Sequence, residues 1–147
     1  METFYLTDTG IVRDHNEDSV IIVENNHGAT LLAVADGMGG HRAGEVASSI
    51  AISYLSKRFV ESFFKMNKAE AVEWIKTSVN EINSHIFKHT EENPESKGMG
   101  TTLVLAIVTD DYILFGNIGD SSGFVIKNNK LHKELCHLNE YWRYLFM

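Results

Sequence analysis

The segment Leu31–Ser49, LLAVADGMGGHRAGEVASS, joins an apolar run to a helical pattern through a glycine-rich stretch. The apolar run ends on Asp36, and four glycines follow it (Gly37, Gly39, Gly40 and Gly44). Glycine-rich turns between a strand and a helix often bind phosphate through their backbone amides. The segment is therefore either a phosphate-binding loop or a site built on the aspartate.

A phosphate-binding loop is disfavoured by the residues that follow the glycines. Gly39 and Gly44 have the spacing of a P-loop, but Glu45 and Val46 stand where lysine and serine or threonine are needed. A dinucleotide-binding loop fails as well, because Arg42 occupies the position of its third glycine. These departures disfavour a nucleotide-binding switch.

The surrounding sequence predicts strands on either side of two long helices. Strands are expected at 4–9, 19–24, 29–36, 101–109, 112–120 and 123–127, and helices at 43–65 and 69–89. The Asn/Gly turn at 25–28 predicts a hairpin, and the nearly continuous apolar run 29–36 predicts burial on both faces. Pro94 marks a polar loop, and the aromatic tail after Lys133 is expected to form a final helix. Segregated helices and antiparallel strands indicate an α+β layered domain.

Both helices are predicted from apolar residues at spacings of three and four. The first has one row at Ala47, Ala51, Leu55, Phe59 and Phe63, beside a second at Val46, Ile50 and Tyr54. The second helix repeats the pattern at Ala71, Trp74, Ile75, Ser78, Val79, Ile82 and Ile86. Each helix should therefore bury one side against the strands.

Composition excludes several classes of function. The 147 residues include 13 basic and 20 acidic side chains, giving a net charge of −7, which argues against nonspecific nucleic-acid binding and anionic membranes. No run approaches the length of a membrane span, so no membrane insertion is expected. The single cysteine, Cys136, allows no internal disulfide, and the cytoplasm is the expected compartment.

Acidic residues stand at the ends of three predicted strands. Glu17 and Asp18 precede the first strand of the hairpin, Asp36 ends the second, and Asp120 follows a later one. If these strands share a sheet, the carboxylates can converge at one rim, where a divalent cation would relieve their repulsion. Oxygen ligands suit Mg²⁺ or Mn²⁺ rather than zinc. Gly37, which lacks a Cβ, could bring its carbonyl close to such an ion.

Other polar residues are weighed beside this cluster. Arg13 lies shortly before the acidic pair, and its guanidinium could bind phosphate oxygens at two points. His41 fits a helix-entry or surface role. His85 and His89 have a zinc-chelating spacing, but no third ligand is evident and they continue the helix's apolar stripe.

Four motifs together resemble the metal-dependent type 2C serine/threonine protein phosphatases in their bacterial form. They are TDTGIVRDHNED, VADGMGGHRAGEVAS, GMGTTLV and NIGDS, in that order along the chain. The resemblance covers about residues 5–132 and implies a β-sandwich flanked by helices, an α-β-β-α fold, with a binuclear metal centre at one end. Met38 occupies a position where bacterial members commonly carry methionine. Gly98, Gly100, Thr101 and Thr102 match a motif interpreted as structural.

The resemblance assigns metal-binding roles to the acidic residues. Asp36 would bridge two metals and the carbonyl of Gly37 would bind one of them. Asp18 would be a further ligand, directly or through water, with Glu17 supporting it. Asp120 would belong to a third, weaker metal site. The implied cofactors are Mn²⁺ or Mg²⁺, two or more ions in a complete site.

The implied activity is hydrolysis of phosphoserine and phosphothreonine in proteins by a metal-activated water. Arg13 would bind the substrate phosphate, and Arg13 and Asp36 would be catalytic. The implied partners are phosphoproteins and a membrane-anchored bacterial serine/threonine kinase whose action the phosphatase reverses. The alternative is a catalytically inactive family remnant or a phosphopeptide-binding module.

The sequence departs from the family pattern at two points. The motif that usually reads Gly-Asp-Ser-Arg has Ser122 in place of arginine, and the downstream DG and DN motifs, which supply two further metal-binding aspartates, do not occur. We therefore interpret residues 1–132 as the N-terminal part of a phosphatase domain and 133–147 as a divergent tail. A frameshift or premature stop near Lys133 would explain this pattern and leave the sandwich incomplete.

Overall fold

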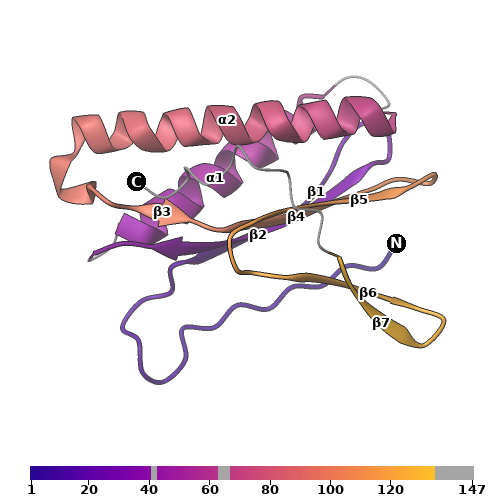
Figure 1. Ribbon diagram of the computed structural model, residues 1–147, viewed down its shortest axis with the longest axis horizontal. Coiled ribbons are helices and arrows are strands. Elements are labelled where there is room, and N and C mark those ends of the chain that lie inside the picture. The colour runs from indigo at the N-terminus through magenta and orange to yellow at the C-terminus, as the bar shows by residue number, and fades with distance from the viewer. Residues whose placement is uncertain (41–42, 63–66, 135–147) are drawn as a thin grey trace.

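The computed structural model describes residues 1–40, 43–62 and 67–134 (Figure 1). Within these ranges, seven strands and two α-helices form in the order β1 (Asp18–Glu24), β2 (Thr30–Met38), α1 (Ala43–Val60), α2 (Lys68–Glu92), β3 (Gly100–Thr101), β4 (Leu103–Val108), β5 (Ile113–Ile118), β6 (Gly123–Lys127) and β7 (Lys130–Glu134). A short 3-10 helix, Pro94–Ser96, lies in the predicted polar loop.

The predicted hairpin is confirmed as β1 and β2, which pair antiparallel from Glu24 opposite Thr30 to Asp18 opposite Asp36. Its turn is organised by Asn25, whose side-chain oxygen accepts hydrogen bonds from the backbone N–H groups of His27 and Ala29. This local closure sets the register of the whole hairpin, because each residue along one strand then has a defined partner on the other.

The hairpin belongs to a five-stranded antiparallel sheet in the order β1-β2-β4-β5. β3 pairs with the end of β2, where Thr101 lies opposite Gly37, and the regular strand resumes at Leu103. The predicted strand 101–109 is therefore interrupted at Thr102, one residue past the end of β3.

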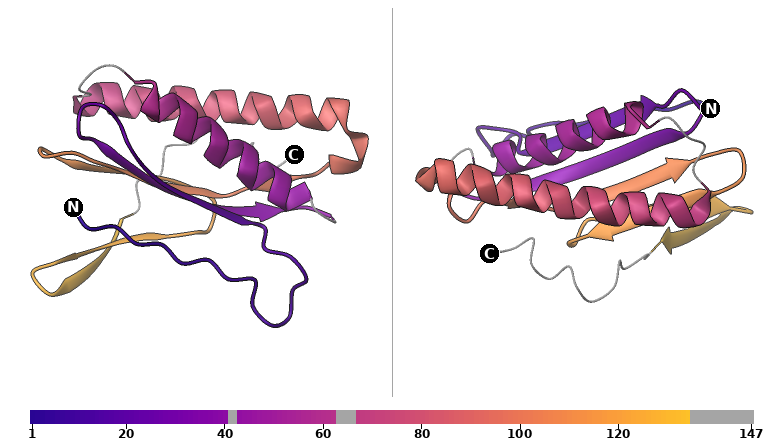
Figure 2. Two further views of the ribbon diagram at one scale, coloured as in Figure 1. Left: turned by 180° about the vertical axis from the view of Figure 1, so that it is seen from behind. Right: turned by 90° about the horizontal axis from the view of Figure 1, so that it is seen from above.

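Both helices cover one face of this sheet (Figure 2). Alternate residues of β2 and β4, among them Leu31, Ala33, Leu105 and Ile107, point toward the helices and are buried. The predicted helix stripes meet them, and the buried helix residues include Ala47, Ala51, Leu55, Phe59, Trp74, Ile75, Val79 and Ile82. The core thus lies between one helical layer and one sheet face.

The two helices are also joined by polar contacts. The Arg58 side chain lies over the ring of Trp74, with its guanidinium carbon 6.0 Å from the ring centroid, and pairs with Glu81. Tyr54 hydrogen-bonds Glu81 and accepts a hydrogen bond from Arg58, and its ring packs against His85. His85 therefore contributes to helix packing, as its place on the apolar stripe indicated.

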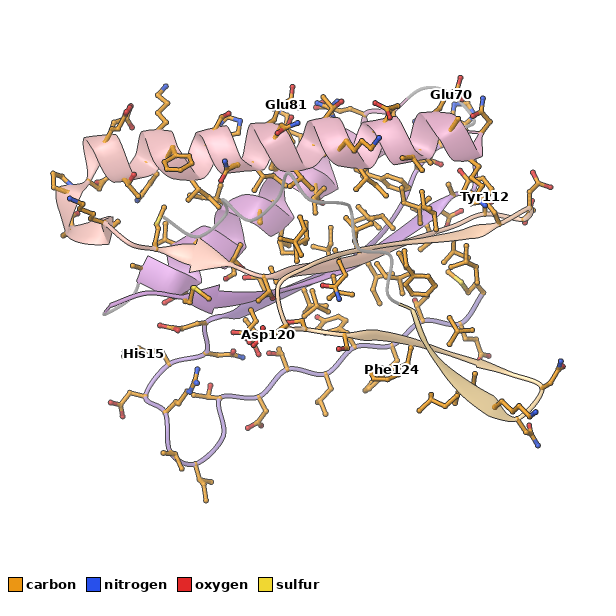
Figure 3. All side chains as sticks on the ribbon, viewed as in Figure 1. His15, Glu70, Glu81, Tyr112, Asp120 and Phe124 are labelled. Carbon is orange, nitrogen blue, oxygen red and sulfur yellow. The ribbon has the colours of Figure 1, made fainter. Side chains whose placement is uncertain are left out.

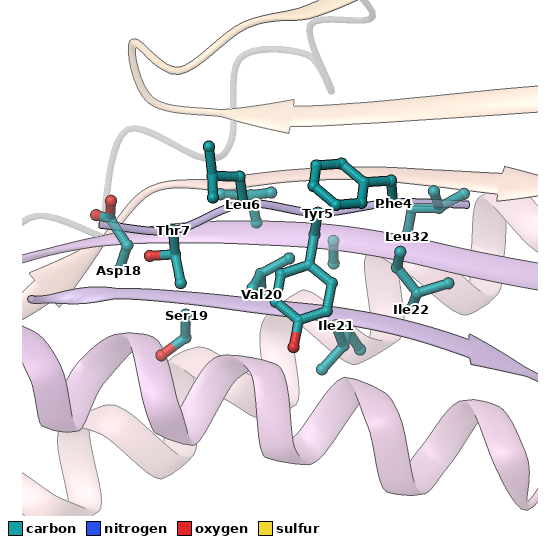
Figure 4. Close-up of a pocket in the computed structure, with 12 residues that line it drawn as sticks. Phe4, Tyr5, Leu6, Thr7, Asp18, Ser19, Val20, Ile21, Ile22 and Leu32 are labelled. Atoms are coloured by element: carbon teal, nitrogen blue, oxygen red, sulfur yellow. The ribbon is translucent and has the colours of Figure 1, made fainter. Parts of the chain in front are cut away.

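The opposite face of the sheet is only partly covered. The N-terminal segment and the β6–β7 hairpin lie on this side (Figure 1). The segment leaves a cavity of about 230 Å³ over β1 and β2 (Figure 4). Val34, on the outer side of β2, is 45% exposed, so the prediction that 29–36 is buried on both faces is wrong. In the part of the chain that the structure describes, helices cover one face of the sheet and not the other (Figure 2).

Three further expectations concern residues 4–9, the end of the first helix and the C-terminal tail. Residues 4–9 form no strand, because no neighbouring strand pairs with them among the described residues. The first helix ends at Val60 rather than at residue 65, and a turn follows. The predicted final helix lies outside the described residues, as do His41 and Phe63.

The α+β class is confirmed. Of the expected α-β-β-α layers, the described residues show one helical layer, the five-stranded sheet, and the separate β6–β7 pair beyond it. Asn128 and Asn129 turn this hairpin with positive φ angles of 52° and 58°, a conformation that asparagine tolerates well.

Candidate metal centre

Asp18 and Asp36 are directly opposite one another at the open end of the β1–β2 hairpin. Directly opposed residues of antiparallel strands have Cβ atoms about 4.5–5.5 Å apart, so the register brings the two carboxyl groups together. Asn16 fixes the start of β1 by accepting a hydrogen bond from the backbone N–H of Asp18 at 3.0 Å. The sequence prediction that these two residues converge is therefore met by strand pairing.

The main chain of Asp36 is held by the two threonines that follow β3's glycine. The backbone N–H of Thr102 donates to the carbonyl oxygen of Asp36 at 2.8 Å, and the Thr101 hydroxyl donates to the same oxygen at 3.0 Å. The Asp36 N–H in turn donates to the hydroxyl of Thr102 at 3.1 Å. Asp36 thus projects from a backbone whose donor and acceptor are both occupied.

Asp120 reaches the same region through the turn after β5. Gly119 has a φ of +101°, and a Cβ there would lie 2.8 Å from the Thr102 methyl carbon, so glycine is required. Ser121 lies within hydrogen-bond distance of Thr102, with 2.9 Å between the two hydroxyl oxygens. Figure 3 shows Asp120 between the sheet and the N-terminal segment.

Gly37 and Glu17 connect the rim, the end of the sheet that carries Asp18, Asp36 and Asp120, to the start of α1. The N–H of Gly37 donates to the backbone oxygen of Glu17, which also accepts a hydrogen bond from the Ser48 hydroxyl at 2.7 Å. The Glu17 carboxylate lies against Gly44, since a Cβ on Gly44 would be 2.9 Å from its Oε2. A carboxylate beside the first turn of a helix is favoured by the helix dipole.

The charges of the rim residues act on one another. The pKa of Asp36 is raised above 3.8, chiefly by loss of solvent around the carboxyl, then by the charge and hydrogen bonding of Asp18 and by the charge of Asp120. The charge of Arg13 acts in the opposite direction and offsets a small part of this rise in the pKa of Asp36. The structure therefore brings Asp18, Asp36, Asp120 and the guanidinium of Arg13 into one electrostatic neighbourhood.

This neighbourhood fits a hard divalent cation. Its side-chain donors are carboxylate oxygens, and a cation would remove the repulsion that now disfavours ionised Asp36. Gly37 has no room for a side chain, because Gly44 and Glu17 backbone atoms fill that space. Among the described residues, no group of three histidine, cysteine or acidic side chains forms a ready-made metal cluster, around these aspartates or around the His85–His89 pair.

Thr101 and Thr102, expected from the sequence to be structural, are connected with the site. Both residues are 2% exposed, and both side chains hydrogen-bond the backbone of Asp36. Ser48 and Ser121 were not singled out from the sequence. The available signal for all four residues was their place in the family motifs GMGTTLV, VADGMGGHRAGEVAS and NIGDS. The contacts themselves join positions distant in sequence, and those between Asp36 and the two threonines span more than sixty residues.

Sequence comparison identifies the class to which this fold and rim correspond. A family model described as Protein phosphatase 2C matches residues 11–146. The chain belongs to this family. It is 39% identical over 133 residues to the serine/threonine phosphatase Stp of Listeria welshimeri, covering 90% of this chain and 53% of that protein.

Solved structures agree with the sequence relationship. The serine/threonine phosphatase Stp1 from Staphylococcus aureus matches with a TM-score of 0.80 and 39% identity, over 87% of this chain and 50% of that one. The serine/threonine phosphatase PstP from Mycobacterium tuberculosis matches with a TM-score of 0.72 and 38% identity, over 86% of this chain and 50% of that one. A structure of the catalytic domain of PstP in complex with two manganese ions matches with the same TM-score and identity, over 86% and 51%. The chain spans about half the length of these relatives and corresponds to their N-terminal half.

No helix in the described parts of the chain is both long and apolar enough to cross a membrane.

Proposed function

We propose that this chain carries the metal- and phosphate-binding half of a Mn²⁺- or Mg²⁺-dependent protein phosphatase acting on phosphoserine and phosphothreonine. The observation that carries the proposal is the strand register, which places Asp18 directly opposite Asp36. Thr102 also links the Asp36 backbone to Ser121, the residue after Asp120. Family membership and the manganese-bound PstP structure support the same chemistry.

The proposed metal ligands are Asp18, Asp36, Asp120 and the carbonyl oxygen of Gly37. Glu17 is proposed as a supporting residue, because its backbone oxygen holds the Gly37 N–H and its carboxylate packs on α1. Bound Mn²⁺ or Mg²⁺ would supply a water of lowered pKa and positive charge for the phosphoryl oxygens. The carboxylates of this chain would hold the ions at a fixed position on the end of the sheet.

Arg13 is proposed to bind the substrate phosphate. It is exposed in the N-terminal segment, and its positive charge acts on Asp36, where it offsets a small part of the rise in the pKa of that carboxyl. A guanidinium can donate two parallel hydrogen bonds to a phosphate and so orient it as well as attract it. Arg13 would thereby hold the phosphoryl group over the aspartate rim and stabilise negative charge on its oxygens.

The proposed substrates are phosphoproteins, and the proposed setting is the cytoplasm, where the enzyme would reverse the action of a membrane-anchored serine/threonine kinase. The relatives Stp and PstP are described as serine/threonine phosphatases. Within this chain, residues 1–132 are proposed as the phosphatase part, and 133–147 as a separate tail.

The test is hydrolysis of a chromogenic aryl phosphate and of a phosphothreonine peptide by the purified chain, with Mn²⁺ titrated in and then removed by chelator. We expect Mn²⁺-dependent turnover that Asp36→Asn abolishes. The matched control is Asp110→Asn, an exposed aspartate in the turn between β4 and β5, which should retain wild-type turnover.

The contrary result is a folded chain that shows no hydrolysis at any Mn²⁺ concentration. Phosphopeptide binding by such a chain would establish the binding-module alternative in place of an enzyme. The absence of both hydrolysis and binding would establish an inactive remnant.

A further inference from the structure

Thr102 makes contacts on two sides that are distant in sequence. On one side it holds Asp36 through two hydrogen bonds, one from its backbone N–H and one to its hydroxyl. On the other side its hydroxyl lies 2.9 Å from that of Ser121. A single buried threonine therefore touches both Asp36 and the residue that follows Asp120.

The contact with Ser121 is itself supported from β5. Asn117 donates a hydrogen bond from its side-chain nitrogen to the backbone oxygen of Ser121 at 2.7 Å. Gly119 packs closely on the Thr102 methyl, so the turn between Asn117 and Ser121 closes around that side chain. The position of Asp120 on the sheet is therefore set by contacts on both sides of it.

We propose that Thr102 is a positioning residue that ties the backbone of Asp36 to the Asp120 turn through its hydroxyl and so fixes the spacing of these two aspartates. The inference rests on the proposed function, because that spacing matters only if both aspartates hold metal. Thr102 touches neither metal nor substrate in this scheme. It acts through the two aspartates.

The threonine side chain allows its two contributions to be separated. Thr102→Val keeps the branched shape that packs on Gly119 but removes the hydroxyl. Thr102→Ser keeps the hydroxyl but removes the methyl group. A purely structural role would make the two variants comparable, whereas a positioning role through the hydroxyl makes only the valine variant defective.

Two readouts besides turnover follow from the contacts. The first is hydrogen exchange at the Asp36 amide, which loses its acceptor in Thr102→Val and keeps it in Thr102→Ser. The second is the affinity of the full chain for Mn²⁺, measured by electron paramagnetic resonance titration. Loss of groups that orient metal ligands typically costs about 10–100-fold in metal affinity.

We expect Thr102→Val to exchange the Asp36 amide faster and to bind Mn²⁺ at least about tenfold more weakly, by the same rule. Thr102→Ser should remain close to wild type in both. The matched control is Thr77→Val, whose hydroxyl bonds only within α2 on the exposed side of the helix, and both readouts should be unchanged.

Unchanged Mn²⁺ affinity in folded Thr102→Val would overturn the positioning role while leaving the proposed function intact. If the valine variant does not fold, Ser121→Ala removes the partner hydroxyl from the loop and must weaken Mn²⁺ binding in the folded chain, or the role is refuted. A folded wild-type chain that binds no Mn²⁺ would refute the proposed function itself, and the positioning role with it.

Discussion

A side chain on Gly37 would have no space, because a Cβ built there lies 2.1 Å from the carbonyl oxygen of Gly44. The same point is 2.7 Å from the backbone oxygen of Glu17. Gly37 follows Asp36 near the end of β2, where it pairs with Thr101 of β3, and Gly44 is the second residue of α1. This close approach brings the helix start onto the rim that carries the aspartates.

Gly37→Ala should destabilise the chain strongly, because both obstructing oxygens belong to the backbone and cannot rotate away. Overpacking of this kind costs about 1–3 kcal/mol or more in free energy of unfolding. Urea denaturation followed by circular dichroism would measure the loss. Gly40→Ala is the matched control, since a Cβ there meets nothing within 4 Å, and its midpoint should stay near wild type. Equal midpoints for the two variants would contradict the steric argument.

The hairpin and its opposed aspartates were predictable because they depend on local sequence. A four-residue Asn/Gly turn between two β-rich runs sets which residues face each other, and Asp18 falls opposite Asp36 as a result. The helix stripes were predictable for the same reason, since a 3.6-residue period reports directly on the buried side.

The hydrogen bonds by which Thr101 and Thr102 hold the Asp36 backbone could not be predicted from local sequence, and neither could the exposure of Val34. Thr102 reaches Asp36 only because β4 pairs with β2, and a single sequence does not state which strands become neighbours. Residues 4–9 have strand-like composition, but a strand also needs a partner. The apolar residues on the outer face of β2 likewise show that this face could be buried, but they do not show which segment, if any, packs against it.

Asp36→Asn should stabilise the metal-free chain near neutral pH. The pKa of Asp36 is raised in the folded state above 3.8 by loss of solvent and by Asp18 and Asp120, so the ionised carboxylate destabilises the fold above that folded-state pKa. The penalty disappears as the pH falls through the folded-state pKa toward the unfolded value, and the two proteins should then converge. Urea midpoints measured in chelator across this pH range test the sign.

Mn²⁺ should reverse the order of these two proteins at neutral pH, because ligand binding stabilises only the chain that holds the ion. Wild type should gain in midpoint with added Mn²⁺ and Asp36→Asn should gain less. Asp110→Asn, in the exposed β4–β5 turn, should gain as wild type does. An Asp36→Asn variant that is less stable than wild type in chelator at neutral pH would contradict the repulsion argument.

Asn67→Ala should lower stability by about 1 kcal/mol, the usual cost of losing a helix N-cap. The Asn67 side chain accepts a hydrogen bond from the Glu70 N–H at 3.0 Å, and the Glu70 carboxylate accepts one from the Asn67 N–H at 2.9 Å. Both bonds of this capping box hold the first turn of α2. Asn80→Ala, on the exposed side of the same helix, is the control and should be neutral or slightly stabilising. Thermal melts of the two variants measure the difference, and equal melting temperatures would contradict the capping role of Asn67.

Asn25→Ala should be among the costlier polar substitutions in the chain, because Asn25 is 5% exposed and its side chain serves three partners. Its oxygen accepts from the N–H groups of His27 and Ala29, and its nitrogen donates to the Ser62 hydroxyl beyond the end of α1. Buried groups that lose their partners cost about 1–3 kcal/mol. Asn26→Ala changes the exposed neighbouring asparagine in the same turn and should shift the urea midpoint little. The turn also sets the register that places Asp18 opposite Asp36. Folded Asn25→Ala should therefore bind Mn²⁺ more weakly than wild type. Wild-type affinity in a destabilised variant would show that the turn does not control the geometry of the metal site.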